Sequence, residues 1–126
     1  MFIARVTTAG SLVRAAGAAL LVLFAAATVY ADPYPHIKDL DNADVMFVQL
    51  EQAISDYYVD AENAMPAPHL SFYSYDAAKG ETLFDLASRA NLPYDTIATL
   101  NRLSGPETFA TGTHLLLSSV PGIFVP

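Results

Sequence analysis

The stretch KGETLFDLASRAN, residues 79–91, decides the fold of the second half of this chain. It predicts a turn at Lys79-Gly80 and then a helix, because Thr82 and Asp85 have the spacing of a capping box. Apolar side chains then recur at the i, i+3, i+4, i+7 spacing of one helix face: Leu83, Leu86, Ala87 and Ala90. Asn91 can end the helix in the left-handed conformation.

The segments on either side of this helix predict the order strand, helix, helix, strand. Residues 71–75, SFYSY, are short and aromatic, as is typical of a strand. Pro93 favours the start of a second helix over 94–101, and residues 114–117, HLLL, predict a second apolar strand. We therefore expect a small α+β domain of βααβ order at 70–118. We expect it to fold by itself, with modest stability, because so short a chain without disulfides buries little.

The first 31 residues have the pattern of a secretory signal peptide. They contain Arg5 and Arg14, no acidic residue, and an uncharged apolar run that ends in Val29-Tyr30-Ala31. An uncleaved membrane anchor is the alternative, but the run is shorter than the roughly 20 residues that a spanning helix prefers. We expect cleavage after Ala31, export to a periplasm, a cell envelope or the extracellular space, and no stable membrane anchor afterwards.

Residues 32–69 predict a leader, an amphipathic helix and a proline-rich linker. The helix is expected over 41–58, with its start capped by one of several acidic or amide side chains. Its apolar stripe is expected to include Val45, Leu50, Ile54 and Tyr57. A stripe of such large side chains is expected to pack on the C-terminal domain or on a partner. Residues 119–126 are expected to form a C-terminal tail.

Charge and composition exclude several classes of function. Of the six basic residues, two lie in the signal segment, so four remain against 13 acidic residues, a formal charge of −9. Such an acidic surface repels nucleic acid and anionic lipid, and a neutral partner fits better. There is no cysteine, so disulfides and thiolate zinc sites are excluded.

The sequence also lacks the patterns of common catalytic sites. His36 lies near Asp39 and Asp41, but in a proline-rich leader that offers a metal no rigid frame, so we expect no metal and no cofactor. There is no nucleophile elbow and no glycine-rich phosphate loop. A glycosidase pair of carboxylates needs a wide cleft, which a domain of about fifty residues rarely supplies. We expect no enzymatic activity.

The ordered set of short motifs in the second half resembles the LysM (lysin motif) domain. The motifs that carry this resemblance are Tyr73-Ser74-Tyr75, Lys79-Gly80-Glu81-Thr82-Leu83, Leu86-Ala87, Leu100-Asn101 and the segment 112–118. Two positions depart from the family pattern. Glu81 replaces the usual aspartate and lengthens the side chain at the helix entrance, and Ser118 replaces the closing proline.

The resemblance implies a βααβ fold and binding of glycans that contain N-acetylglucosamine, such as peptidoglycan or chitin. It places the binding groove between two loops, whose residues here are Gly80, Glu81, Thr82 and Leu83 on one wall and Leu103, Ser104, Gly105 and Pro106 on the other. Gly80 and Gly105 would let the backbone approach the sugar. The same residues could serve the fold alone, because Thr82 caps a helix and Leu83 packs in a core whether or not sugar binds.

The whole chain also resembles the region ahead of the catalytic domain in some secreted lysostaphin-type zinc endopeptidases. Those enzymes hold zinc with an H-x-x-x-D motif and a later H-x-H motif, and this chain has neither. Three hypotheses therefore stay open. The chain is a glycan-binding module, the targeting or regulatory segment of a truncated peptidoglycan endopeptidase, or an interaction module that uses the LysM fold only as a scaffold.

Overall fold

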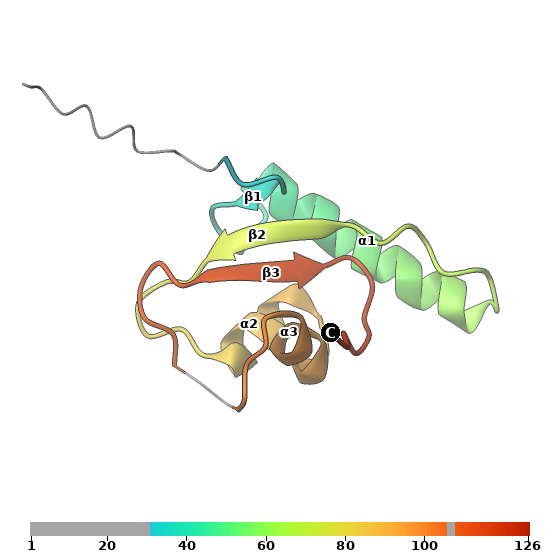
Figure 1. Ribbon diagram of the computed structural model, residues 1–126. Helices are drawn as coiled ribbons and strands as arrows, with labels where there is room; N and C mark the ends of the chain where they lie inside the picture. Colours follow the sequence, from blue (N-terminus) through green and yellow to red (C-terminus); the bar gives the residue numbers. More distant parts are fainter. Residues whose placement is uncertain (1–30, 106–107) are drawn as a thin grey trace, which may run out of the picture.

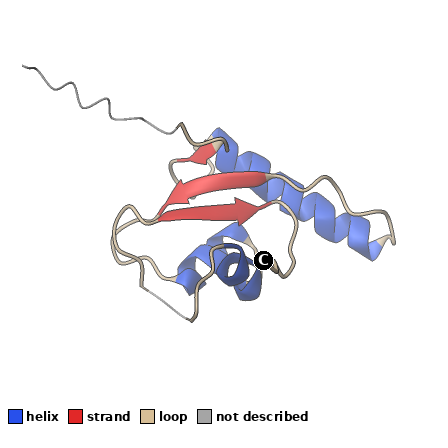
Figure 2. Cartoon of the chain, viewed as in Figure 1, coloured by secondary structure: helices blue, strands red, loops and turns tan. Residues whose placement is uncertain are grey.

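The computed structural model describes residues 31–105 and 108–126, which form a three-stranded sheet packed on three helices (Figures 1 and 2). The predicted signal peptide lies outside the described residues except for Ala31. The elements in chain order are β1 (His36–Ile37), α1 (Val45–Glu62), β2 (Phe72–Asp76), α2 (Leu83–Ala90), α3 (Tyr94–Leu100) and β3 (His114–Ser118). Among the described residues, no helix is long and apolar enough to cross a membrane.

The predicted βααβ unit is confirmed in order and nearly in its boundaries. β2 and β3 pair antiparallel, with Phe72 opposite Ser118 and Asp76 opposite His114. Both halves of the predicted capping box are present at the start of α2, and Asn91 ends that helix in the left-handed conformation, at φ 52°. The four apolar residues of the predicted α2 stripe are all buried. Local chemistry was therefore sufficient to place these elements.

The sheet has a third strand that the sequence did not predict. β1 pairs parallel with β2, with His36 opposite Ser74 and Ile37 opposite Tyr75. The Ile37 side chain is fully buried. A strand of only two residues has no sequence pattern of its own. β1 is therefore recognised only by its pairing with β2, which lies 38 positions further along the chain.

Helix α1 begins four residues later than predicted and ends four residues later. Its N-cap is Asp44, whose carboxylate accepts hydrogen bonds from the amides of Met46 and Phe47. The buried stripe is Phe47, Leu50 and Ile54, whereas Val45 is 64 % exposed. The prediction of Val45 as a core residue was wrong, because the actual cap turns that position toward solvent.

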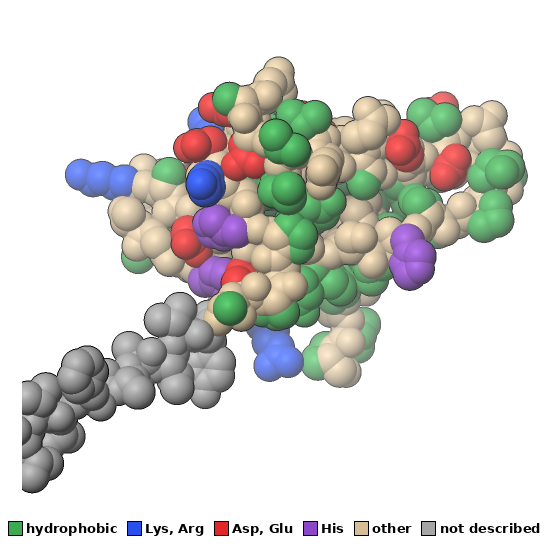
Figure 3. Space-filling model, turned by 90° about the horizontal axis from the view of Figure 1, so that it is seen from above, with side chains coloured by type: hydrophobic (Ala, Val, Ile, Leu, Met, Phe, Trp, Pro, Cys, Tyr) green, Lys and Arg blue, Asp and Glu red, His purple; other side chains and the backbone are tan. Residues whose placement is uncertain are grey.

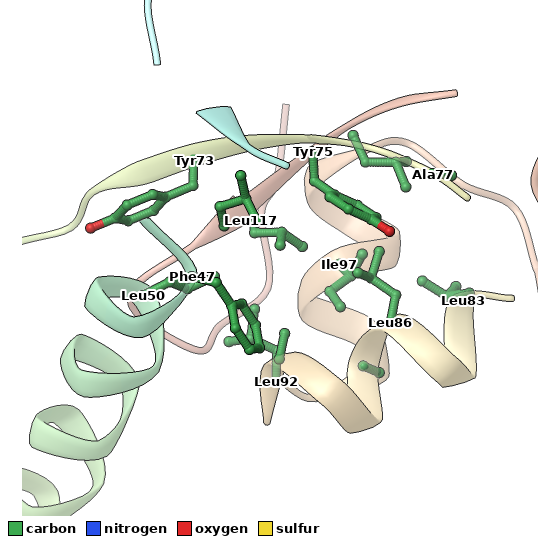
Figure 4. Close-up of a cluster of buried hydrophobic side chains, with 14 of the residues drawn as sticks. Phe47, Leu50, Tyr73, Tyr75, Ala77, Leu83, Leu86, Leu92, Ile97 and Leu117 are labelled. Atoms are coloured by element: carbon green, nitrogen blue, oxygen red, sulfur yellow. The ribbon is translucent and has the colours of Figure 1, made fainter. Parts of the chain in front are cut away.

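One hydrophobic core joins the N-terminal segment to the βααβ unit (Figure 4). Tyr73, Tyr75 and Leu117 point from the sheet toward the helices. Phe47 of α1 reaches Leu92, which lies between α2 and α3. The segment 32–69 therefore contributes part of the domain's interior, and we revise the expectation that 70–118 is a self-sufficient folding unit.

Residues 119–126 pack back onto the domain. The amide of Gly122 donates to the hydroxyl of Thr96, 3.0 Å away. The amide of Phe124 donates to the hydroxyl of Thr99, 3.1 Å away. The Phe124 ring lies 6.0 Å from that of Phe72 in β2. These contacts attach the end of the chain to α3 and to the sheet.

Replacing Asp44 by alanine is expected to lower the free energy of unfolding by about 2 kcal/mol at neutral pH. The carboxylate accepts four backbone amides, two from α1 and two from Lys38 and Asp39, so it fastens β1 to the helix. Partial burial alone would raise the pKa of Asp44, but these hydrogen bonds outweigh it and lower the pKa below its ordinary value of 3.8.

Because the pKa of Asp44 is lowered in the folded state, the stabilisation by its carboxylate is fully present above the ordinary carboxyl pKa. This stabilisation is lost as the pH falls through the folded-state pKa. Urea unfolding at pH 7 and at pH 3 measures it, and the gap between parent and variant should shrink at pH 3. Asp39→Ala is the control, since its side chain is exposed. An equal effect of both substitutions at pH 7 would contradict the capping role.

Candidate functional site

The first predicted wall is a tight turn that leads into α2. The amide of Glu81 donates to the carbonyl of Ala78 over 3.2 Å, which closes a turn with Lys79 and Gly80 at its centre. Gly80 has φ +75°, and a Cβ built there would meet nothing within 4 Å. Glycine is therefore needed for the backbone conformation rather than for lack of space.

The Glu81 side chain points into the protein rather than into a groove. One of its carboxylate oxygens accepts the Tyr75 hydroxyl at 2.8 Å and the Ala78 amide at 3.1 Å, and only 7 % of the residue is exposed. Burial, and next the hydrogen bond to Glu81 and its charge, raise the pKa of the Tyr75 phenol to about 12. The longer acid at position 81 therefore stabilises the turn from inside.

The other two residues of the first wall have structural roles as well. The Thr82 amide and hydroxyl both donate to the Asp85 carboxylate, at 2.9 and 2.7 Å. The Leu83 side chain is fully buried. A ligand at this wall can therefore meet the backbone of the turn, but not the side chains of Glu81 or Leu83.

The second predicted wall follows α3, and Asn101 at the end of that helix connects this part of the chain to the sheet. The Asn101 side-chain amide donates to the Leu116 carbonyl at 2.8 Å and accepts the Leu116 amide at 2.7 Å, which ties the end of α3 to β3. Leu103 packs partly on the core, and Ser104 is exposed. Gly105 is half-buried, and a Cβ built there would meet nothing within 4 Å. Pro106 lies outside the described residues.

Two residues that the sequence did not single out contact the first wall. Thr108 forms an isolated antiparallel bridge with Thr82, and the Phe109 amide donates to the Glu81 carbonyl over 2.9 Å. Phe109 is 5 % exposed and belongs to the core. Residues 108 and 109, which follow the second wall in the chain, are thus attached to the first wall.

Several backbone amides of the two loops have no hydrogen-bond acceptor among the described residues. Within residues 31–105 and 108–126, the amides of Gly80, Ser104 and Gly105 donate to no other described residue. Open amide donors suit a ligand that presents carbonyl and hydroxyl oxygens. Lys79 and Arg102 each directly precede one of the two walls, and both side chains are exposed.

A separate group of polar residues lies on the outer face of the sheet, seen in Figure 3 as histidine and acidic side chains close together. His114 contacts Asp76 at 2.8 Å and Asp32 at 3.3 Å. The Nδ1 atom of His36 lies 3.0 Å from the Ser74 hydroxyl. The sequence had grouped His36 with Asp39 and Asp41 as a metal-like cluster. Within the part of the chain that the structure describes, no three such side chains are placed to hold a metal ion.

Two hollows of the surface lie outside the predicted walls. One, of about 300 Å³, is formed where β1 meets the start of α1 and includes Lys38 and Asp44. The other, of about 190 Å³, lies between the end of α3 and the C-terminal segment. We do not assign the site to the first hollow, because the Asp44 carboxylate there is already occupied by four backbone amides.

The comparison with family models identifies the domain that contains both loops. The family model described as LysM domain matches residues 75–117, which include both loops and Thr108–Phe109. Residues 75–117 form a LysM domain. Comparison with curated proteins and with solved structures gave no match.

The match also shows what lies outside the LysM domain. It begins within β2 and ends within β3, so β1 and α1 lie outside the matched residues although their side chains share the same core. None of the comparisons links the chain to lysostaphin-type peptidases, and that part of the expected resemblance has no support.

Proposed function

We propose that the LysM domain of this chain binds glycans that contain N-acetylglucosamine, in peptidoglycan or in a chitin-like polymer, between the loops at 80–83 and 103–106. The observation that carries the proposal is the LysM match over both loops, in which the amides of Gly80, Ser104 and Gly105 donate to no other described residue. The sugar is neutral and presents hydroxyls and one acetamide, which pair well with amide donors. The acidic surface does not repel such a ligand.

The proposed binding is weak and nearly independent of salt. One copy of the domain lacks the avidity of tandem modules. A dissociation constant between millimolar and high micromolar corresponds to about −4 to −6 kcal/mol. Salt has little effect because neither the sugar nor the proposed contacts depend on paired charges.

Gly105→Val is expected to weaken binding about tenfold, or about 1.4 kcal/mol, without unfolding the protein. The new side chain has room and no left-handed backbone to strain, but it covers an amide that the sugar is proposed to use. Gly80→Val is the poorer test, because at φ +75° a branched side chain strains the fold itself.

The assay is sedimentation of residues 32–126 with insoluble peptidoglycan and with chitin. Gly122→Val is the matched control, since that glycine is equally open and lies in the C-terminal segment. A folded parent that sediments with neither polymer would exclude the proposed function and leave the interaction module as the better hypothesis. Equal sedimentation of Gly105→Val and parent would move the site away from the second loop.

We further propose that the chain acts by binding and does not hydrolyse the glycan. Glu81, the acidic residue within the first loop, accepts two hydrogen bonds and is buried, so its carboxylate does not face a ligand. Incubation of residues 32–126 with an N-acetylglucosamine pentamer, followed by mass analysis of the products, tests this. Shorter oligomers in the parent sample would overturn it.

Cleavage after Ala31 is expected in the exported protein, because the apolar run of the signal segment ends there with small residues at both required positions. The first residue of the cleaved chain would be Asp32, whose carboxylate contacts His114. Intact-mass measurement of the exported protein checks the cleavage site. A chain that retains Met1 and fractionates with membranes would show that the segment is an anchor.

A further inference from the structure

Two aromatic side chains on the helices form an exposed stacked pair. The rings of Phe84 in α2 and Tyr94 in α3 have centroids 4.9 Å apart and planes inclined by 27°. Tyr94 packs partly against the core, whereas 58 % of Phe84 is exposed. Because Tyr94 covers one face of the Phe84 ring, the opposite face is available to solvent.

The fold itself does not account for phenylalanine at this position. Phenylalanine is a mediocre helix former, and residue 84 is not part of the buried α2 stripe. A single exposed apolar residue is ordinary, but this ring is held in place by a second one. It also follows directly after Leu83, the last of the four residues predicted for the first wall and the first residue of α2. A fixed aromatic face beside open amide donors is typical of sites for ligands with both polar and apolar sides.

We infer that Phe84, supported by Tyr94, is a platform on which one sugar ring of the bound glycan stacks. A pyranose ring presents a face of C–H groups that a flat aromatic ring can cover, while its hydroxyls stay in water or reach the amides of the loops. The inference rests on the proposed function, because it assigns the aromatic pair to the same glycan chain. It extends the site beyond the two loops and makes it selective for longer oligomers.

The test compares a dimer and a pentamer of N-acetylglucosamine, titrated into residues 32–126, which contain every described element. Phe84→Ala is expected to weaken binding of the pentamer about three- to tenfold and to leave binding of the dimer unchanged. Phe84→Leu should behave in the same way, because it keeps apolar bulk but loses the ring. Tyr58→Ala, which removes an exposed aromatic side chain from α1, is the matched control and should bind both oligomers as the parent does.

The ligand signals give a second readout that a purely structural role would not change. Ring protons of one sugar unit in the pentamer should shift upfield with the parent and with Tyr94→Phe, and not with either Phe84 variant. Unchanged pentamer binding by Phe84→Ala would overturn the platform and leave the loop site standing. Equal weakening for both oligomers would also overturn it, since Phe84 would then act through the loop. A folded parent that binds neither oligomer would instead reject the proposed function itself.

Discussion

Leu86→Asp is expected to leave the LysM domain unfolded at 25 °C. Leu86 is fully buried in the middle of the α2 stripe, where it faces Ile97 and the sheet (Figure 4). An unpaired carboxylate at that point costs several kcal/mol, and the cavity and lost burial of leucine add to it. The total stability of a domain of this size is only about 5–15 kcal/mol. Far-ultraviolet circular dichroism and urea unfolding measure the result.

Ser88→Asp is the matched control, because it introduces the same residue on the exposed face of the same helix. It should unfold at nearly the same urea concentration as the parent. A cooperative transition of Leu86→Asp at the parent's midpoint would show that the buried face of α2 is assigned wrongly.

Leu50→Ala is expected to lower the free energy of unfolding of the whole protein by about 2–5 kcal/mol. Leu50 lies in α1, outside the LysM match, yet its side chain is fully buried in the shared core. Since 1 kcal/mol moves the melting temperature of a domain this size by roughly 4–8 °C, the variant should melt at least 8 °C below the parent. Removing residues 32–69 altogether should have a larger effect.

Gln49→Ala serves as the control for Leu50→Ala, because residue 49 is exposed on the same turn of α1. Thermal unfolding should be a single transition for both variants, since one core joins α1 to the sheet. A LysM domain that melts at the parent's temperature in Leu50→Ala, or without residues 32–69, would show that α1 is an accessory rather than part of the domain.

The parts of the fold that short-range chemistry determines could be predicted from the sequence. The capping box of Thr82 and Asp85, the αL residue Asn91 and the α2 stripe depend on contacts within a few positions. The start of α1 could not be chosen in this way, because Asp41, Asn42 and Asp44 are all suitable caps. Asp44 is selected by the additional amides of Lys38 and Asp39, which only the folded chain brings near.

The sequence predicted the candidate site as a pair of loops, but it did not predict which way the side chains of those loops point. The inward position of Glu81 depends on the Tyr75 hydroxyl, which approaches from β2. The role of Phe109 depends on a hydrogen bond across 28 positions, and no local pattern predicts such a contact. The sequence therefore predicted two loops, whereas packing turns the side chains of Glu81 and Leu83 into the protein.

We propose that the loops at 80–83 and 103–106 bind N-acetylglucosamine oligomers. The most direct test titrates the pentamer into isotope-labelled residues 32–126 and follows the backbone amide chemical shifts. We expect shifts at 79–84, 103–105 and 108–109, with the exposed face of α1 unaffected. A folded sample that shows no shift at millimolar sugar, or shifts confined to α1 and the outer face of the sheet, would contradict it.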